Sequence, residues 1–101
     1  MATEIAFFPL WSDNQTSPGY RFYRIDHPSG SVFKWAWDES DGETMFESGI
    51  FKTFVEVLED AVLDARQNVN DPIESAGLVG DLKRRIAFEE YLDTSVALGE
   101  D

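Results

Sequence analysis

The fold is decided by residues 44–64, TMFESGIFKTFVEVLEDAVLD, which join a strand pattern directly to a helix pattern. We expect Thr44–Phe51 to form a strand and the residues after Lys52 to form a helix. Thr53 followed three residues later by Glu56 has the spacing of a capping box, which marks a helix start. The helix should be apolar on one side, because apolar residues recur at helical spacing: Phe54, Leu58, Ala61, Val62 and Ala65.

Three segments before this stretch also have strand patterns: Glu4–Phe8, Tyr20–Asp26 and Ser31–Asp38. The turn His27–Gly30 connects the second segment to the third, with proline at its second position and glycine at its fourth. A reversal at Asp41 and Gly42 then connects the third segment to Thr44–Phe51. The four segments therefore predict an antiparallel meander.

The two turns fix the register independently, and both place aromatic side chains on one face of the sheet. Pairing Asp26 with Ser31, and Ser40 with Glu43, predicts four cross-strand neighbours: Tyr20–Trp37, Phe22–Trp35, Trp37–Phe46 and Phe33–Ile50. The opposite face is mixed: Arg21, Tyr23, Lys34, Asp38 and Glu47. A slip of one residue would turn a strand over, so the agreement supports this register. The aromatic face needs a cover.

The second half of the chain predicts further helices. Asp71, followed by a proline, is expected to cap a helix that Gly77 and Gly80 keep short. Asp81 is expected to cap a third helix, Leu82–Leu92, and the tail from about residue 94 is expected to fray. The sequence therefore predicts a single α+β domain over residues 1–101. Its antiparallel β-meander has three to four strands, and two to three helices cover the aromatic face.

The chain is strongly acidic, with 20 acidic residues against 8 basic ones and a formal net charge of −12. Bare nucleic acid and anionic membranes would repel it, so we expect direct binding to neither. Hydrophobic residues make up 43% of the chain, which is too many for a disordered segment. The sequence has no cysteine, no signal-peptide pattern and no membrane-spanning run, and we expect a soluble cytoplasmic protein.

Candidate chemical motifs are few. Asp38–Glu43 holds four acids and a glycine, but the spacing is not that of a calcium loop and the predicted turn accounts for it. His27 is the only histidine and lies in a turn, and no nucleophile elbow, P-loop or dinucleotide fingerprint occurs. We therefore expect a non-enzymatic protein with no metal and no cofactor. A carboxylate enzyme is the alternative, and it would require a buried acid with a raised pKa.

Acidity is concentrated between Asp38 and Glu74, where eleven acids and two bases give a charge of −9. A DNA duplex carries about one charge per 1.7 Å of axis, whereas helix residues four apart are separated by about 6 Å. A helix stripe alone is therefore too sparse to imitate DNA, but hairpin acids or a dimer would raise the density. The candidate partner-binding residues are Asp38, Glu39, Asp41, Glu43, Glu56, Glu59, Asp60 and Asp64, and the last four are expected to look outward from the helix.

In size, charge and lack of a catalytic motif, the chain resembles small acidic inhibitors that engage basic proteins. These include phage-encoded DNA mimics, anti-restriction and anti-CRISPR proteins, and immunity proteins that block nuclease toxins. The resemblance implies a binding protein whose negative patch occludes a basic surface, such as that of a nucleic-acid-binding enzyme or complex.

The main alternative is a structural or assembly domain that forms homo- or hetero-oligomers through apolar surface. Its acidity would then serve only solubility or salt adaptation. The expected contacts are Phe7, Phe8, Leu10 and Trp11, or else Phe51 and Tyr23 on the second face of the sheet. High salt would leave such a homodimer intact, whereas it would weaken a complex held by charge.

Overall fold

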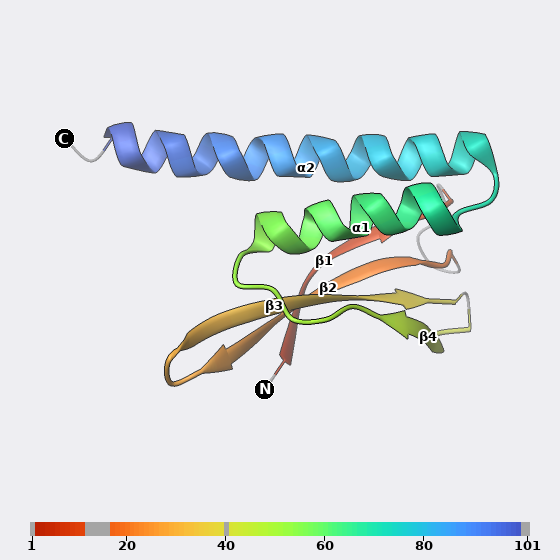
Figure 1. The fold of residues 1–101 in the computed structure, drawn as a ribbon, viewed down its shortest axis with the longest axis horizontal. Helices are drawn as coiled ribbons and strands as arrows, with labels where there is room; N and C mark the ends of the chain where they lie inside the picture. Colours follow the sequence, from red (N-terminus) through yellow and green to blue (C-terminus); the bar gives the residue numbers. More distant parts are fainter. Residues whose placement is uncertain (1, 12–16, 40, 100–101) are drawn as a thin grey trace.

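The computed structural model describes residues 2–11, 17–39 and 41–99, with side chains as far as Leu92. Four strands form one antiparallel sheet in the order β1-β2-β3-β4, and two helices lie over one of its faces (Figure 1). The strands are β1 (Ala2–Pro9), β2 (Gly19–His27), β3 (Gly30–Asp38) and β4 (Thr44–Glu47). The helices are α1 (Phe54–Asn68) and α2 (Pro72–Gly99). The predicted α+β meander is confirmed.

The register of β2 and β3 is the predicted one. Tyr20 lies opposite Trp37, and Phe22 lies opposite Trp35. The ring of Tyr20 packs edge to face on both tryptophans, with centroid distances of 5.1 Å to Trp35 and 4.8 Å to Trp37. Gly30 closes the connecting turn with a φ of 134°, a conformation that favours glycine over residues with a side chain.

β4 pairs with β3 over a shorter stretch than predicted. Trp37 lies opposite Phe46, as predicted, but β4 ends at Glu47 instead of continuing to Phe51. The predicted closing pair of this hairpin includes Ser40, which lies outside the described residues.

The predicted pair Phe33–Ile50 is wrong, because the chain gains one residue after β4. The side chain of Ser48 accepts the backbone N–H of Trp35 at 2.9 Å, where a regular ladder would use a carbonyl. Phe51 then bridges to Phe33 through two backbone hydrogen bonds of 2.8 Å each. The extra residue acts like a bulge and moves Ile50 out of the ladder.

α1 begins at the predicted capping box. The hydroxyl of Thr53 accepts the N–H of Glu56 at 3.1 Å, and the carboxylate of Glu56 accepts the N–H of Thr53 at 3.3 Å. Phe54 packs its ring on Phe22, with centroids 5.8 Å apart. The buried face of the helix matches the predicted apolar spacing, with one residue added by the structure: Val57, Leu58, Ala61, Val62 and Ala65.

α2 is one continuous helix, so the two separate helices predicted for this region are wrong. Asp71 caps it as predicted, since its carboxylate accepts two backbone N–H groups of the first turn at 2.9 and 3.0 Å. Gly77 and Gly80 lie inside the helix. A glycine there costs about 1 kcal/mol, but the adjacent Leu78 and Leu82 are buried in the core and offset that cost.

The predicted cap of a third helix, Asp81, lies within α2 and forms an ion pair with Arg84. α2 continues past the predicted end at Leu92 to Gly99 and extends well beyond α1 (Figure 1). None of the described helices is long and apolar enough to cross a membrane.

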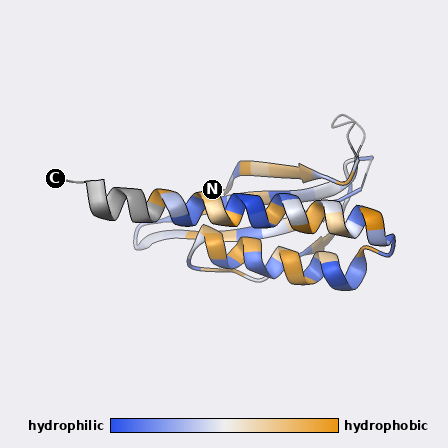
Figure 2. Ribbon diagram, turned by 90° about the horizontal axis from the view of Figure 1, so that it is seen from above, coloured by the Kyte–Doolittle hydropathy of each residue, from blue (hydrophilic) through white to orange (hydrophobic). Residues whose placement is uncertain are grey.

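The core lies between the helices and the sheet. Its buried members come from β2, β3, α1 and α2: Tyr20, Phe22, Trp35, Val57, Leu58, Ala61, Val62, Ala65, Leu78 and Leu82. Seen from above, α1 and α2 lie side by side, and each mixes hydrophobic with hydrophilic positions (Figure 2). β1 adds partly buried side chains to this core, whereas β4 adds none. The helix layer therefore packs on the first three strands.

Candidate protein-docking surface

The structure divides the eight predicted acids into three groups. The first is Asp38, on the sheet face opposite the helices. The second lies at the turn between β3 and β4: Glu39, Asp41 and Glu43. The third lies along α1: Glu56, Glu59, Asp60 and Asp64. The surroundings of the three groups differ, and so does what each group can bind.

Asp38 is nearly buried and belongs to an ion-pair network on the open face of the sheet. Its carboxylate lies 2.9 Å from Nε of Arg21 and accepts the hydroxyl of Thr44 at 2.6 Å. Arg21 also pairs with Glu4 at 3.0 Å and lies over the ring of Phe7. The carboxylate of Asp38 is thus engaged within the domain.

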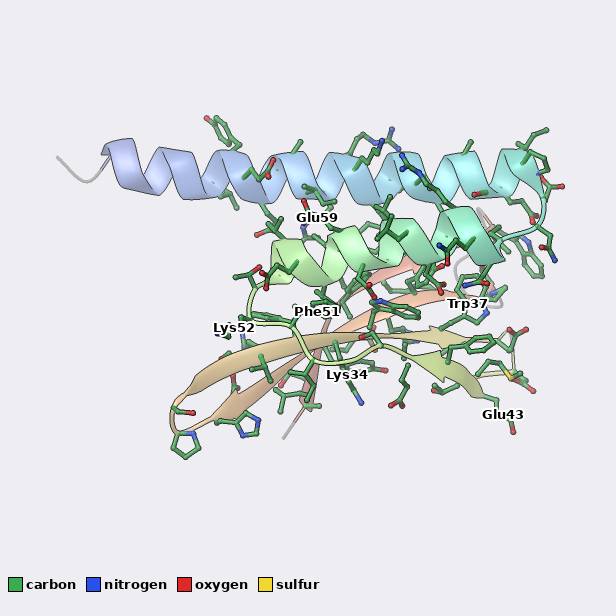
Figure 3. All side chains as sticks on the ribbon, viewed as in Figure 1. Lys34, Trp37, Glu43, Phe51, Lys52 and Glu59 are labelled. Carbon is green, nitrogen blue, oxygen red and sulfur yellow. The ribbon has the colours of Figure 1, made fainter. Side chains whose placement is uncertain are left out.

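The same open face holds a second cation with its own partner. Lys34 points away from the helices (Figure 3) and lies 3.3 Å from the carboxylate of Glu47. Its ammonium group also lies 6.0 Å from the centre of the Tyr23 ring. Burial and the nearby charge of Asp38 raise the pKa of Tyr23. Each of these two cations is therefore matched by carboxylates.

The acids of the turn are exposed. Glu39 accepts the indole N–H of Trp37 at 2.7 Å. Asp41 accepts the backbone N–H of Glu43 at 2.9 Å and stabilises the turn at Gly42, whose φ is 88°. Within the described part of the chain, none of the three acids forms an ion pair.

Two of the α1 acids face the sheet, so the prediction that all four look outward is wrong. Asp60 accepts the indole N–H of Trp35 at 2.8 Å, and Asp64 accepts the hydroxyl of Tyr20 at 2.6 Å. Buried tyrosine and tryptophan side chains need a partner for their polar atom, and these carboxylates supply it. Glu59 is exposed and projects from α1 away from the sheet (Figure 3).

The hydrogen bond between Tyr20 and Asp64 joins α1 to the sheet. Burial raises the pKa of Tyr20 far above its ordinary value of 10.0, and the hydrogen bond to Asp64 and the charges of Asp64 and Asp60 raise it further. The phenol therefore remains a neutral donor. This donor links β2 to α1.

Two pockets open between α1 and residues 44–52, and we call this surface the α1–β4 groove. One, of about 440 Å³, lies at the C-terminal end of α1 and includes aromatic and acidic side chains: Tyr20, Trp37, Phe46, Glu39, Asp64, Asp71 and Glu74. The other, of about 570 Å³, lies toward the N-terminal end of α1. It is lined by Ile50, Phe51, Lys52, Glu56, Glu59, Asp60 and Leu63.

Three apolar side chains of this groove are exposed. Phe46 is 63% exposed, Ile50 64% and Leu63 56%. The sequence placed Phe46 and Ile50 under the helices, and Phe46 does pair with Trp37 on the helix side. It is exposed because the helix layer packs on the other three strands. A repeat pattern indicates which face of a strand is apolar, but not how far two helices reach across the sheet.

The contacts predicted for an assembly domain are mostly engaged within the chain. Five of the six are half-buried: Phe7, Phe8, Leu10, Tyr23 and Phe51. Trp11 is the sixth and is exposed. Outside the groove, α2 has strongly exposed apolar side chains: Ile73, Phe88 and Tyr91.

Within the described residues, no group of three or more acidic or histidine side chains is arranged to hold a metal ion. Comparison with protein families, with curated proteins and with solved structures finds no match to this chain. Function is therefore inferred from the surface of the molecule.

Proposed function

We propose that the protein is a small non-enzymatic inhibitor, which docks its acidic surface on a basic surface of a nucleic-acid-handling protein and blocks that surface. The observation that carries the proposal is the unequal pairing of charges. Of the eleven acids between Asp38 and Glu74, only Asp38 and Glu47 have a cationic partner among the described residues. The other nine are Glu39, Asp41, Glu43, Glu56, Glu59, Asp60, Asp64, Asp71 and Glu74.

The cations that form ion pairs are matched with other acids than these nine. They belong to the sheet and to α2: Arg21, Arg24, Lys34, Arg84 and Arg85. The acids along the α1–β4 groove and the neighbouring turn therefore keep most of their negative potential. Such a surface attracts a positive one, speeds its association and makes the complex sensitive to salt.

Proteins that bind nucleic acids offer the matching chemistry. Their surfaces carry clustered lysine and arginine side chains that contact phosphates. Carboxylates of the groove and turn would occupy the places of phosphates, and the bulk of the domain would exclude the nucleic acid. We place the protein in the cytoplasm, together with such enzymes.

The proposal is tested by capturing partners of the tagged protein from its native host at low and at high salt. We expect a basic nucleic-acid-handling protein at low salt, identified by mass spectrometry, and its loss at high salt. The captured protein should also lose nucleic-acid binding when this chain is added. Capture that is unaffected by salt would contradict the charge-based mechanism.

A charge variant then tests the surface itself. It carries Glu43→Lys, Glu59→Lys and Glu56→Gln, which change the net charge from −12 to −7, since two reversals and one neutralisation add five units. Glutamine keeps the capping box intact. Asp60 and Asp64 are left unchanged because they accept hydrogen bonds from the sheet. We expect the affinity for the partner to fall at least about tenfold.

The matched control has the same net charge, with its changes on α2: Asp81→Asn, Glu89→Lys and Glu90→Lys. It should retain the partner. If both variants lose the partner equally, total charge governs binding and this surface does not. If neither variant weakens binding, the proposed function is wrong.

A second candidate is an assembly domain, and one observation favours it. α2 extends beyond α1 and exposes Phe88 and Tyr91. A second copy would cover this part of α2. A dimer that persists at high salt and is lost on Phe88→Ser with Tyr91→Ser supports this candidate, whereas a monomer at low and high salt contradicts it.

A further inference from the structure

In the part of the chain that the structure describes, no helix packs over β4. Phe46 lies on the helix side of the sheet, opposite Trp37, yet most of its side chain is exposed. Ile50, in the segment that follows β4, is equally exposed; Phe46 lines one pocket of the α1–β4 groove and Ile50 lines the other. A sheet face of this kind is normally covered, so the space beside α1 has the character of a binding groove.

The wall that α1 contributes to this groove has three acidic side chains and one apolar side chain. Glu56 lies three residues before Glu59 and four before Asp60, Leu63 lies four residues after Glu59 and three after Asp60, and all four line the groove. Such residues share one side of a helix. The floor is aromatic and aliphatic, with Phe51 and Trp37 beneath α1 toward its two ends (Figure 3).

The charge of the groove selects its occupant. Among the described residues, Lys52 is the only cation in the lining, against seven carboxylates, and it forms no ion pair there. A second copy of this chain would bring its own excess of acids against these carboxylates. An uncharged apolar segment would cover the floor but leave the acidic wall unmatched. The complementary occupant has both apolar and basic side chains.

We infer that the α1–β4 groove binds an amphipathic basic helix of the partner protein, which lies beside α1 and completes the helix layer over β4. This inference rests on the proposed function and names the part of the partner that is recognised. The apolar side of the incoming helix would contact Phe46, Ile50 and Leu63, in the helix-in-groove manner. Its lysine or arginine side chains would pair with Glu56 and Glu59. α1 has 15 residues, so a partner helix of similar length would span the groove.

The test uses two synthetic peptides of 16 residues that contain arginine at the same positions. One has leucine along one helical side, and the other has serine in place of each leucine. We expect the arginine–leucine peptide to bind at least about tenfold more tightly by calorimetry, because only it fills the apolar floor. In ¹⁵N-labelled protein it should shift the amide signals of Phe46, Ile50 and Leu63.

The variant Phe46→Ser with Ile50→Ser should lower the affinity for the arginine–leucine peptide about tenfold and leave the arginine–serine peptide unchanged. Tyr91→Ser, which changes an exposed apolar residue on α2, is the control and should change neither affinity. Circular dichroism checks that both variants remain folded. The peptide itself should gain helical signal on binding.

Three results would overturn the inference. They are equal binding of the two peptides, amide shifts centred on another surface, and an extended peptide paired with the edge of β4. A dimer of this chain that buries Phe46 would overturn it as well. If the groove variant captures the natural partner normally while the charge variant does not, the groove inference fails and the proposed function stands. If the charge variant also captures it normally, both fail.

Discussion

The two sides of the sheet handle the same kinds of residue in different ways. On the open side, Arg21 and Lys34 lie among carboxylates and over aromatic rings, so acids and bases are matched within the domain. Along the α1–β4 groove, carboxylates accept hydrogen bonds from Trp35 and Tyr20 or lie exposed. On the open side, the charged side chains pair with one another and stabilise the domain. The carboxylates of the groove have no cationic partner in the described part of the chain.

The largest effect on stability should come from removing an ion pair on the open side of the sheet. Arg21→Met leaves Asp38, whose side chain is only 10% exposed, without a cation. Removing one partner of a buried ion pair is strongly destabilising. Because Arg21 itself is partly exposed, we expect the free energy of unfolding to fall by about 2 kcal/mol. Chemical denaturation at neutral pH measures the change.

Two further variants show whether the loss comes from the unpaired charge. Adding Asp38→Val to Arg21→Met should recover part of the stability, because it removes the stranded carboxylate. Arg24→Met breaks an ion pair whose side chains are both about half exposed, and it should have little effect. Equal losses for Arg21→Met and Arg24→Met would mean that the open side is not specially stabilised by its ion pairs.

A second prediction concerns the link between the groove acids and the sheet at high pH. Unfolded Tyr20 loses its proton near the ordinary pKa of 10.0, whereas burial and Asp64 keep folded Tyr20 protonated. The folded state then binds more protons, so the free energy of unfolding falls as the pH rises past 10. Below that pH the contribution of Tyr20 is fully present. One such proton gives a slope of up to about 1.4 kcal/mol per pH unit.

The variant Tyr20→Phe isolates this contribution. Because the hydrogen bond to Asp64 is removed, the free energy of unfolding should be about 1 kcal/mol lower at neutral pH. Above pH 10 it should fall less steeply than that of the wild type. Urea unfolding at neutral pH measures the loss of stability, and urea unfolding at several alkaline pH values measures the slope. Tyr91→Phe on the exposed side of α2 should follow the wild type. Parallel alkaline slopes for wild type and Tyr20→Phe would contradict the role given to this hydrogen bond.

Local rules predicted most of the fold because the deciding signals lie close together in the chain. The turn before Gly30 set the register of β2 and β3, and Thr53 and Asp71 set two helix starts. The errors arose where distant contacts outweighed local preference. Leu78 and Leu82 keep α2 continuous through two glycines, and this packing depends on α1.

The candidate site was less accessible to sequence reasoning. Net charge identified an acidic block, but the same residue types have different roles within it. Asp38 pairs with Arg21, Asp60 accepts a hydrogen bond from Trp35, and Glu59 is exposed. The first two roles depend on contacts between residues distant in sequence. One signal was available, because a buried tyrosine or tryptophan requires an acceptor and the nearest candidates were the acids of the covering helix.

The smallest effect should be seen in the groove without any partner. Glu56, Asp60 and Asp64 are like charges four residues apart along α1, and each such pair costs about 0.3 kcal/mol. Added sodium chloride screens this repulsion, so moderate salt should raise the melting temperature. Asp60→Asn removes both pairs at once and retains an acceptor for Trp35, so its melting temperature should depend less on salt.

Glu89→Gln on α2, which removes one charge of an ion pair with Arg85, should instead leave a salt dependence as steep as that of the wild type. If the melting temperatures of Asp60→Asn and the wild type depended identically on salt, the groove acids would not repel one another. The two sides of the sheet would then differ only in whether their carboxylates form ion pairs.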